Sequence, residues 1–323
     1  MSKRIHPKPV SLAEIFIKFS SDEQCFDYIE KMRWPDGVVR CTVCGNDKIV
    51  KVERKAGSKN RRKWFYLCQE KTCHNQFSPT SGTLFADSHL PLLTWFHAIG
   101  LMLNAKKGIS AKQLQRDLGI GGYKTAWYLN HRIREAMGNG DIPKLGGIVE
   151  IDETYVGGKI SGKGISYAKK QKQVVMGAIQ RGGELRLEHV TGATVGNFRE
   201  FIQKHVSEDV ERVMTDQHPA YPAALASYPA SHETVNHIKH EYVRGDVTTN
   251  AIESVFSLFK RGVIGQYHKL SAKHLQRYLT EFEYRFNRRN DADVFIETVA
   301  RLCGFKPLRF ADLTSDPEPS VPF

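Results

Sequence analysis

The chain has 323 residues, and its 47 lysines and arginines against 35 aspartates and glutamates give a formal net charge of +12. This length allows two or more domains, and the excess of positive charge favours polyanionic partners. Six cysteines are too few for a disulfide scaffold, and the longest apolar run, 90–103, is too short to cross about 30 Å of hydrocarbon. We therefore expect a cytoplasmic protein with no membrane partner.

The first expected element is an N-terminal helical segment, residues 1–35. Ser11 and Glu14 have the spacing of a capping box, in which a serine hydroxyl and a glutamate three residues later bond backbone N–H groups at a helix start. The pattern predicts an amphipathic helix that begins near Ser11, rather than the apolar core of a secretion signal.

Two close pairs of cysteines follow within residues 36–85. Four thiolates form the closed tetrahedral site that is typical of structural Zn²⁺, and a module of this size folds only with its metal. We predict a zinc ribbon with the ligands Cys41, Cys44, Cys68 and Cys73. His74 is the alternative to the last ligand, because the second pair has four intervening residues instead of the commoner two. The stretch 51–63 carries seven lysines and arginines, which suits contact with phosphates.

Helical spacing of apolar residues marks the segment 86–140. Two helices separated by the glycine-rich turn 119–122 are typical of a helix-turn-helix-like DNA-binding module, although a plain packing hairpin has the same pattern. The positive charge of the second helix favours the first interpretation. We expect Lys124, Arg132 and Arg134 to be presented to a DNA groove or to phosphates.

The segment 145–290 has the pattern of an α/β domain. Apolar runs at 148–151, 174–179 and 185–190 predict a meander of three strands. A helix at 197–206, a strand at 212–215, a short helix near Tyr221 and a strand near Val235 are predicted to follow. This order matches a ribonuclease-H-like mixed sheet, which we expect to form the catalytic core. Residues 291–323 are predicted to form a C-terminal helix and a disordered tail.

Acidic residues stand where two of these strands end. Asp152 lies on the first strand and Asp216 directly follows the fourth. Since ligands of α/β sheets gather beyond the strand ends, we expect both carboxylates to meet there and to bind Mg²⁺ or Mn²⁺. Two such ions can activate an attacking oxygen and stabilise the leaving oxygen of a phosphodiester.

A third metal ligand is expected from the predicted helix at 248–261. Asn250 and Glu253 are three residues apart and therefore neighbours on the helix surface. Charge favours Glu253, but the amide oxygen of Asn250 remains an alternative. Lys260 and Arg261 are expected to contact DNA phosphates. We interpret the other acids of the region as surface carboxylates or helix caps: Glu150, Glu153 and Asp246.

Several motifs together resemble a known family. They are Arg33-Trp-Pro-Asp-Gly37, Phe77-Ser-Pro-Thr-Ser-Gly-Thr83, Glu150-Ile-Asp-Glu-Thr-Tyr-Val-Gly-Gly158, Thr215-Asp-Gln-His218, Val235-Asn-His237 and Asn250-Ala-Ile-Glu253. In this order, behind a zinc ribbon, they look like the IS1595-type insertion-sequence transposases, the ISXO2-like group. The resemblance runs from about Ser21 to about Arg289.

The resemblance implies a DDE-type transposase. Such an enzyme cuts the ends of a mobile element by metal-assisted hydrolysis and joins the freed 3′-hydroxyls to target DNA. Its partners would be the element's terminal inverted repeats, target DNA and further copies of the chain. The family's third catalytic position is either Asn or Glu and is followed by a basic residue, which Lys260 matches, so Asn250 and Glu253 both stay open. His237 resembles a recurring family histidine, and a structural role for it is equally plausible.

Two other functions use the same features. A non-catalytic DNA-binding regulator, or an inactive relic, would need only the zinc ribbon and the helical module. A structure-directed nuclease would use the acidic core to cleave DNA without joining it.

Overall fold

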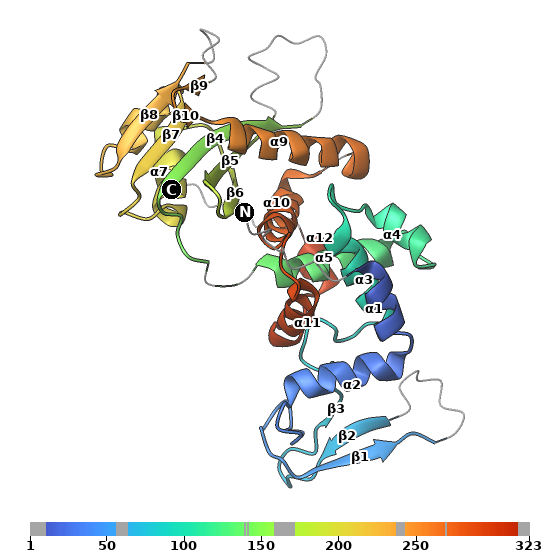
Figure 1. The fold of residues 1–323 in the computed structure, drawn as a ribbon. Helices are drawn as coiled ribbons and strands as arrows, with labels where there is room; N and C mark the ends of the chain where they lie inside the picture. Colours follow the sequence, from blue (N-terminus) through green and yellow to red (C-terminus); the bar gives the residue numbers. More distant parts are fainter. Residues whose placement is uncertain are drawn as a thin grey trace, which may run out of the picture. The chain divides into compact units, whose positions relative to one another are not determined.

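The computed structural model describes residues 11–55, 64–138, 140, 142–157, 172–236, 243–268 and 270–315 (Figure 1). The chain forms two compact units. The first comprises Met1–Ala105, Ala111–Met137 and Asn290–Phe323, and the second comprises Lys106–Ser110 and Gly138–Arg289. Within the described ranges, no helix is both long and apolar enough to cross a membrane. His237, residues 56–63 of the basic stretch and residues 316–323 of the predicted tail lie outside the described residues.

Two capped helices open the first unit. In α1, Leu12–Lys18, the backbone N–H of Glu14 donates to the Ser11 hydroxyl at 3.1 Å, and the N–H of Ser11 donates to the Glu14 carboxylate at 3.2 Å. The predicted capping box is therefore confirmed. A second capping box, formed by Ser21 and Gln24, starts α2, Asp22–Arg33.

A small antiparallel sheet follows α2. Its strands β1, Ile49–Glu53, β2, Trp64–Cys68, and β3, Gln76–Phe77, pair in the order β1-β2-β3. The buried side chains beside it are few, with Trp34, Tyr66 and Phe77 packed around two of the cysteines. So small a core fits a module that depends on bound metal.

The remaining helices of the first unit come from both ends of the chain. They are α3, Leu92–Asn104, α4, Ala111–Asp117, α5, Tyr123–Gly138, α11, Val294–Gly304, and α12, Phe310–Thr314. Gly119, at φ +62°, turns the chain between α4 and α5, as the glycine-rich spacing predicts. The C-terminal helix α11 packs against α2 and α3.

A mixed five-stranded sheet forms the centre of the second unit. Its strands are β4, Ile148–Val156, β5, Gln173–Gln180, β6, Leu185–Val190, β7, Arg212–Asp216, and β8, Ser231–Val235. They pair in the order β6-β5-β4-β7-β8, with β4 antiparallel to β5 and parallel to β7. The predicted meander and the ribonuclease-H-like mixed sheet are confirmed.

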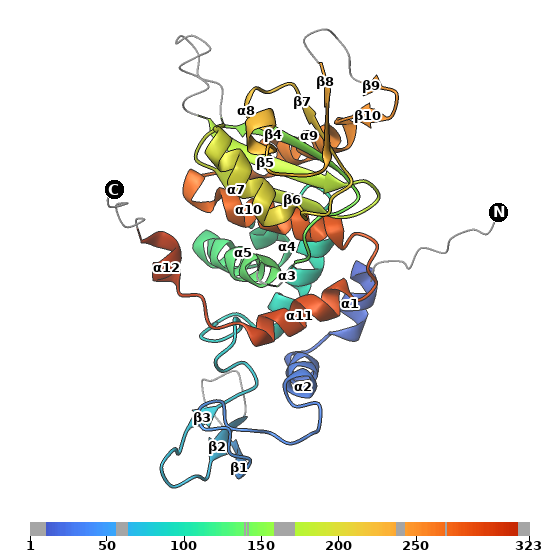
Figure 2. The ribbon, with the colours of Figure 1, turned by 90° about the vertical axis from the view of Figure 1, so that its left-hand side faces the viewer.

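Helices cover both faces of this sheet (Figure 2). On one face, α7, Val195–His205, and α8, Ala220–Ala224, pack on Val149, Ile151 and their neighbours. On the other face lie α9, Asn250–Gly262, and α10, Ala272–Asn287, which bury Val175, Ile179 and Leu187. The short strands β9, Val243–Arg244, and β10, Val247–Thr248, precede α9, and the π-helix η2, Val263–Tyr267, follows it.

The edge strand β6 is closed by side chains of α10. The backbone N–H groups of Leu185, Leu187 and His189 donate to side chains of Asn287, Glu283 and Gln276, each at 2.8 Å. An open edge would expose these donors to pairing with another chain. Helix α10 therefore protects the sheet as well as covering it.

The predicted domains map onto the two units unevenly. The zinc ribbon, most of the helical segments and the C-terminal helix belong to the first unit, whereas the range 145–290 largely coincides with the second. The finer division into five parts stays a prediction.

Candidate metal centres

The four predicted zinc ligands lie together in the first unit. The Sγ atoms of Cys41, Cys44, Cys68 and Cys73 are all within 4.8 Å of one another, with separations of 3.7 Å between Cys41 and Cys73 and 3.6 Å between Cys44 and Cys68. In a tetrahedron with Zn–S bonds of about 2.3 Å, the sulfur atoms are roughly 3.8 Å apart. The cluster fits Zn²⁺, and it contains Cys73 rather than the exposed His74.

Backbone and amide donors surround the Cys41 sulfur. The N–H of Val43 lies 3.4 Å from it, and the side-chain amide of Asn75 lies 3.8 Å from it. Burial alone would raise the pKa of this thiol, but backbone donors at Cys44 and Val43 outweigh that effect and lower the pKa to about 6. The thiolate, which is the form that binds zinc, is therefore favoured at this position.

An acidic cluster lies at the end of strand β7 in the second unit. Carboxylate oxygens of Asp152, Glu153 and Asp216 lie within 4.8 Å of one another. Strands β4 and β7 run parallel with Glu150 opposite Met214, so two residues further along both strands Asp152 is level with Asp216. Two acids far apart in sequence thus meet because the register of these strands brings them together.

Glu153 joins this cluster although it belongs to the opposite face of β4. The Tyr221 hydroxyl of α8 donates to its Oε2 at 3.0 Å, and His218 Nε2 lies 4.0 Å from its Oε1. Its side chain is only 7% exposed, so the interpretation of Glu153 as a surface carboxylate or helix cap is wrong. Strand β4 continues to Val156, past the last residue of β7, and this open edge lets the carboxylate reach the neighbouring acids. Its position beside Asp152 was the one signal in the sequence.

Glu150 has a different role on the same strand. Its carboxylate accepts from the backbone N–H groups of Ala251 at 2.9 Å and Ile252 at 3.4 Å, and from Arg181 Nε at 3.1 Å. It therefore caps the N-terminus of α9, where a negative charge also complements the helix dipole. The helix-cap interpretation is confirmed for Glu150. Asp246, in contrast, is an exposed acid that pairs with Arg212 at 2.5 Å.

A glycine lets α9 approach the sheet beside Asp152. Gly177 of β5 pairs with Asp152, and a Cβ at this position would lie 2.7 Å from Ile252 Cδ1 and 2.8 Å from Phe256 Cζ. Any larger residue would push these two side chains of α9 away. The glycine and the Glu150 cap together fix α9 over the acidic cluster.

The acids strongly perturb one another. Burial is the main cause that raises the pKa of Asp152 to about 8, and the charges of Glu153, Asp216 and Glu253 raise it further. The pKa of Glu153 is also raised, first by burial and then by Asp216. Mutual repulsion between buried carboxylates is relieved by a bound cation, and oxygen ligands suit Mg²⁺ or Mn²⁺.

Comparison with known families gives these two centres a context. Residues 144–287 match the ISXO2-like transposase domain, and residues 20–76 match the transposase zinc-ribbon domain, so the two matched ranges cover more than half of the chain. The chain belongs to the IS1595 family of transposases. The zinc cluster and the acidic cluster of this transposase each lie within one of the matched domains.

A relative from Halobacterium salinarum supports the assignment. The chain is 29% identical over 282 residues to an uncharacterised protein in the transposable element ISH50 of Halobacterium salinarum. The similarity covers 83% of this chain and 91% of the relative. It therefore extends over most of both proteins rather than over one shared domain.

The two candidates for the third ligand differ in their surroundings. The Glu253 carboxylate accepts from the buried Thr249 hydroxyl at 2.8 Å, and Glu253 is close enough to Asp152 to raise its pKa. Asn250 is an exposed residue at the start of α9. Glu253 is not among the three acids whose oxygens lie within 4.8 Å of one another.

The basic residues of α9 lie two turns further along. Lys260 is affected by the charge of Asp152, which favours its protonated form, while burial lowers its pKa overall. Arg261 is exposed and donates to the Ser257 hydroxyl at 2.9 Å. Lys260 is thus close enough to Asp152 for the two charges to interact.

Two predicted DNA contacts in the helical module need correction. Arg132 and Arg134 of α5 are each only 2% exposed, so the expectation that they face a DNA groove is wrong. The Arg132 guanidinium lies over the rings of Trp95 and Tyr128 and donates to the Ala86 carbonyl. Helical periodicity alone did not show which face of α5 is covered by α3. Lys124 is exposed, as expected.

Proposed function

We propose that this chain is an active DDE-type transposase that cuts the ends of its element and joins the freed 3′-hydroxyls to target DNA. The observation that carries the proposal is the meeting of Asp152 and Asp216, with Glu153 beside them, under helix α9. A protein that only binds DNA would not need buried carboxylates that repel one another. The high pKa of Asp152 in the absence of a cation is expected of a metal site.

The proposed cofactors are Mg²⁺ or Mn²⁺ at the acidic cluster and structural Zn²⁺ at the cysteines. Bound divalent ions lower the pKa of an attacking water or 3′-hydroxyl and stabilise the leaving oxygen of the phosphodiester. Asp152 and Asp216 would hold these ions. Glu153, kept in place by the Tyr221 hydroxyl, adds a further oxygen ligand.

Helix α9 supplies the remaining groups in this proposal. Glu253 is the favoured third catalytic ligand because it carries a charge and is oriented by the Thr249 hydroxyl. Asn250 remains the alternative. Lys260, near Asp152, would bind a phosphate adjacent to the bond that is cut. Glu150 would be a positioning residue, because its contacts with the N-terminus of α9 hold Asn250, Glu253 and Lys260 in place relative to β4.

The partners follow from the same chemistry. The zinc ribbon and the exposed Lys124 and Arg261 would bind the terminal inverted repeats and target DNA through phosphates. Because two element ends have to be brought together, we propose a homo-oligomer. A cytoplasmic location would keep the zinc-binding thiols reduced.

A strand-transfer assay tests the proposal. Full-length protein with Mn²⁺ and DNA carrying the inverted repeats that flank its gene should produce joined products. Asp152→Ala and Asp216→Ala should abolish cleavage and joining while leaving DNA binding intact, and the exposed acid variant Glu211→Gln should remain active. Full activity in either aspartate variant would refute the catalytic assignment.

The same assay separates the alternatives. Cleavage without joining would indicate a nuclease, and DNA binding without cleavage under any metal would indicate a regulator or a relic. For the third ligand, we expect Glu253→Gln to lose activity and Asn250→Ala to keep most of it. The reverse result would assign Asn250.

A further inference from the structure

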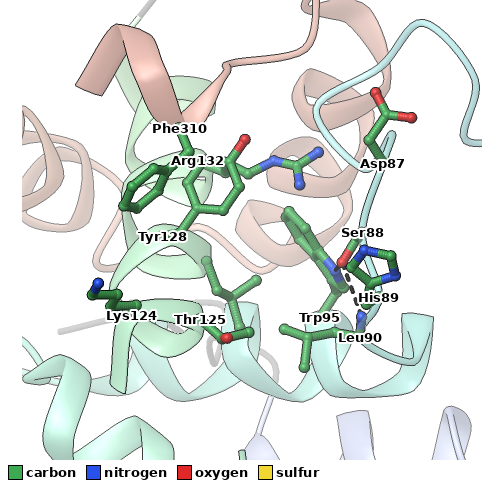
Figure 3. A pocket seen from close by; sticks show the side chains of 11 residues that line it. Asp87, Ser88, His89, Leu90, Trp95, Lys124, Thr125, Tyr128, Arg132 and Phe310 are labelled. Carbon is green, nitrogen blue, oxygen red and sulfur yellow. Dashed lines mark hydrogen bonds between the residues drawn. The ribbon is translucent and has the colours of Figure 1, made fainter. Parts of the chain in front are cut away.

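A pocket of about 340 Å³ lies within the first unit, between the start of α5, the segment before α3 and helix α12 (Figure 3). We propose that it binds a single nucleobase that has left the stack of a DNA strand. This inference rests on the proposed function, because it requires DNA as the partner. Its volume lies at the lower end of the range of about 300–1,000 Å³ for small-ligand pockets.

Three aromatic rings from separate parts of the chain line this pocket. They belong to Trp95, Tyr128 and Phe310. The Tyr128 and Phe310 rings have centroids 5.5 Å apart at an interplanar angle of 89°. The Trp95 indole N–H donates to the Ser88 hydroxyl at 2.9 Å, and the Tyr128 hydroxyl donates to the Leu308 carbonyl. Trp95 itself is almost fully buried, whereas the partly exposed Tyr128 and the exposed Phe310 offer preformed ring surfaces on which a nucleobase can stack.

A buried arginine packs against two of these rings. The guanidinium of Arg132 lies 4.7 Å from the Trp95 ring centroid and 5.1 Å from that of Tyr128, and its side chain is almost fully buried. One of its terminal nitrogens donates to the Ala86 carbonyl, but Nε has no hydrogen-bond partner in the described structure. This Nε is fully buried, so Arg132 supports the two rings and does not itself contact the occupant.

The rim of the pocket matches a nucleotide rather than an apolar side chain. Exposed Lys124 stands on one side and would contact a phosphate next to the inserted base. Asp87 stands on the other side, where it could accept from an exocyclic amino group. An apolar occupant would use neither charge.

Binding measurements with defined DNA probes test the proposal. The probes are a fully paired short duplex, the same duplex with one bulged adenine, and the same bulge with an abasic residue in place of the adenine. A bulged base is already unpaired, so the pocket can take it at a lower cost than a paired base. We expect full-length protein to bind the adenine bulge about tenfold more tightly than the abasic bulge, as one base–aromatic stack predicts.

Variants at the mouth of the pocket localise this preference. Thr125 is exposed and lines the pocket, so Thr125→Trp should fill it without disturbing the core, whereas Thr125→Ser leaves it open. Phe310→Ala removes one ring, and Tyr123→Ala is its matched control, since Tyr123 is exposed on the same unit and does not line the pocket. The preference for adenine should disappear in Thr125→Trp, weaken in Phe310→Ala and persist in the two controls.

The outcomes keep this inference separate from the proposed function. Wild-type protein that binds the paired duplex but shows equal affinity for adenine and abasic bulges would overturn the inference alone. No binding to any DNA would overturn both. A Thr125→Trp protein that retains the adenine preference would also refute the pocket. The proposal would also be refuted if the wild-type protein showed no base preference and its oligomer dissociated in Thr125→Trp. The occupant would then be a second copy of the chain.

Discussion

Asp152 illustrates, at the scale of single residues, how a metal site can weaken a fold that lacks the metal. Its carboxyl lies among two other acids whose oxygens are within 4.8 Å, and burial together with these charges raises its pKa to about 8. A carboxyl with a higher pKa in the folded state than in the unfolded state stabilises the fold only while it is protonated. That contribution is complete below about pH 4 and is lost as the pH rises to about 8.

Replacing Asp152 with asparagine should therefore raise the melting temperature of the zinc-loaded protein without Mg²⁺ or Mn²⁺ at pH 8, by roughly 2–8 °C. The difference from wild type should vanish below about pH 4, since the wild-type carboxyl is then protonated in both states. Mn²⁺ should raise the melting temperature of wild type but not that of Asp152→Asn. Thermal unfolding followed by circular dichroism, without added chelator so that zinc is retained, measures both effects. Equal pH profiles for Asp152→Asn and wild type would contradict this account, and Glu211→Gln serves as the control.

Tyr221 offers a second prediction at this scale. Its buried hydroxyl donates to Glu153, so Tyr221→Phe removes the group that orients this carboxylate and changes little else. Loss of such an outer-shell partner typically lowers metal affinity or activity about 10-fold or more. We expect weaker Mn²⁺ binding by calorimetry and an unchanged fold. Tyr228→Phe, which removes a hydroxyl bonded to backbone carbonyls away from the acids, should bind Mn²⁺ like wild type.

At the scale of elements, the position of α9 relative to β4 and β5 assembles the site. The carboxylate of Glu150 holds the start of the helix, and Gly177 allows its middle to approach the strand opposite Asp152. The sequence indicated a helix with Glu253 and Lys260 on it. It gave no sign that a glycine 76 positions before Glu253 would determine how close this helix lies, because that contact exists only between packed elements.

Gly177→Ala should therefore reduce activity without changing any catalytic group. The added methyl would lie under 3.0 Å from Ile252 and Phe256, so α9 has to shift, at a cost of roughly 1–3 kcal/mol in stability. Urea denaturation and the strand-transfer assay measure the two effects. Gly146→Ala, which meets nothing within 4 Å, should change stability by less than about 0.5 kcal/mol. If both variants behave alike, the close approach of α9 is not what limits activity.

At the scale of the whole molecule, the chain builds two units from interleaved segments. Helix α11, near the C-terminus, packs on α2 and α3, and the Leu84 N–H donates to the Leu302 carbonyl at 3.0 Å. The short segment Lys106–Ser110 belongs with the second unit, where the Lys106 carbonyl accepts from Arg285. The sequence predicted the ribbon, the helical module and the C-terminal helix as separate parts. Contacts between residues distant in sequence bring them together in one compact unit.

The zinc site provides a prediction at this scale. Purified wild-type protein should contain about one Zn²⁺ per chain, and Cys68→Ser should lose it together with the ordered ribbon. Cys303→Ser, outside the cluster, should keep the metal. Elemental analysis and DNA-binding measurements check these outcomes. A Cys68→Ser protein with full zinc content and DNA affinity would rule out the ribbon.

The sequence by itself determined the zinc ligands, the order of strands and helices, and the positions of Asp152 and Asp216. Close cysteine pairs, apolar periodicity and acids at strand ends are local patterns. Local patterns can be recognised in one sequence without knowledge of its tertiary structure. Only the tertiary structure decided that Glu153 joins the acids, that Glu150 caps α9, and that Arg132 and Arg134 are buried. Each of these depends on which face of an element its neighbours cover and on where a paired strand ends. Those are properties of packing between distant segments, which periodicity within one segment does not contain.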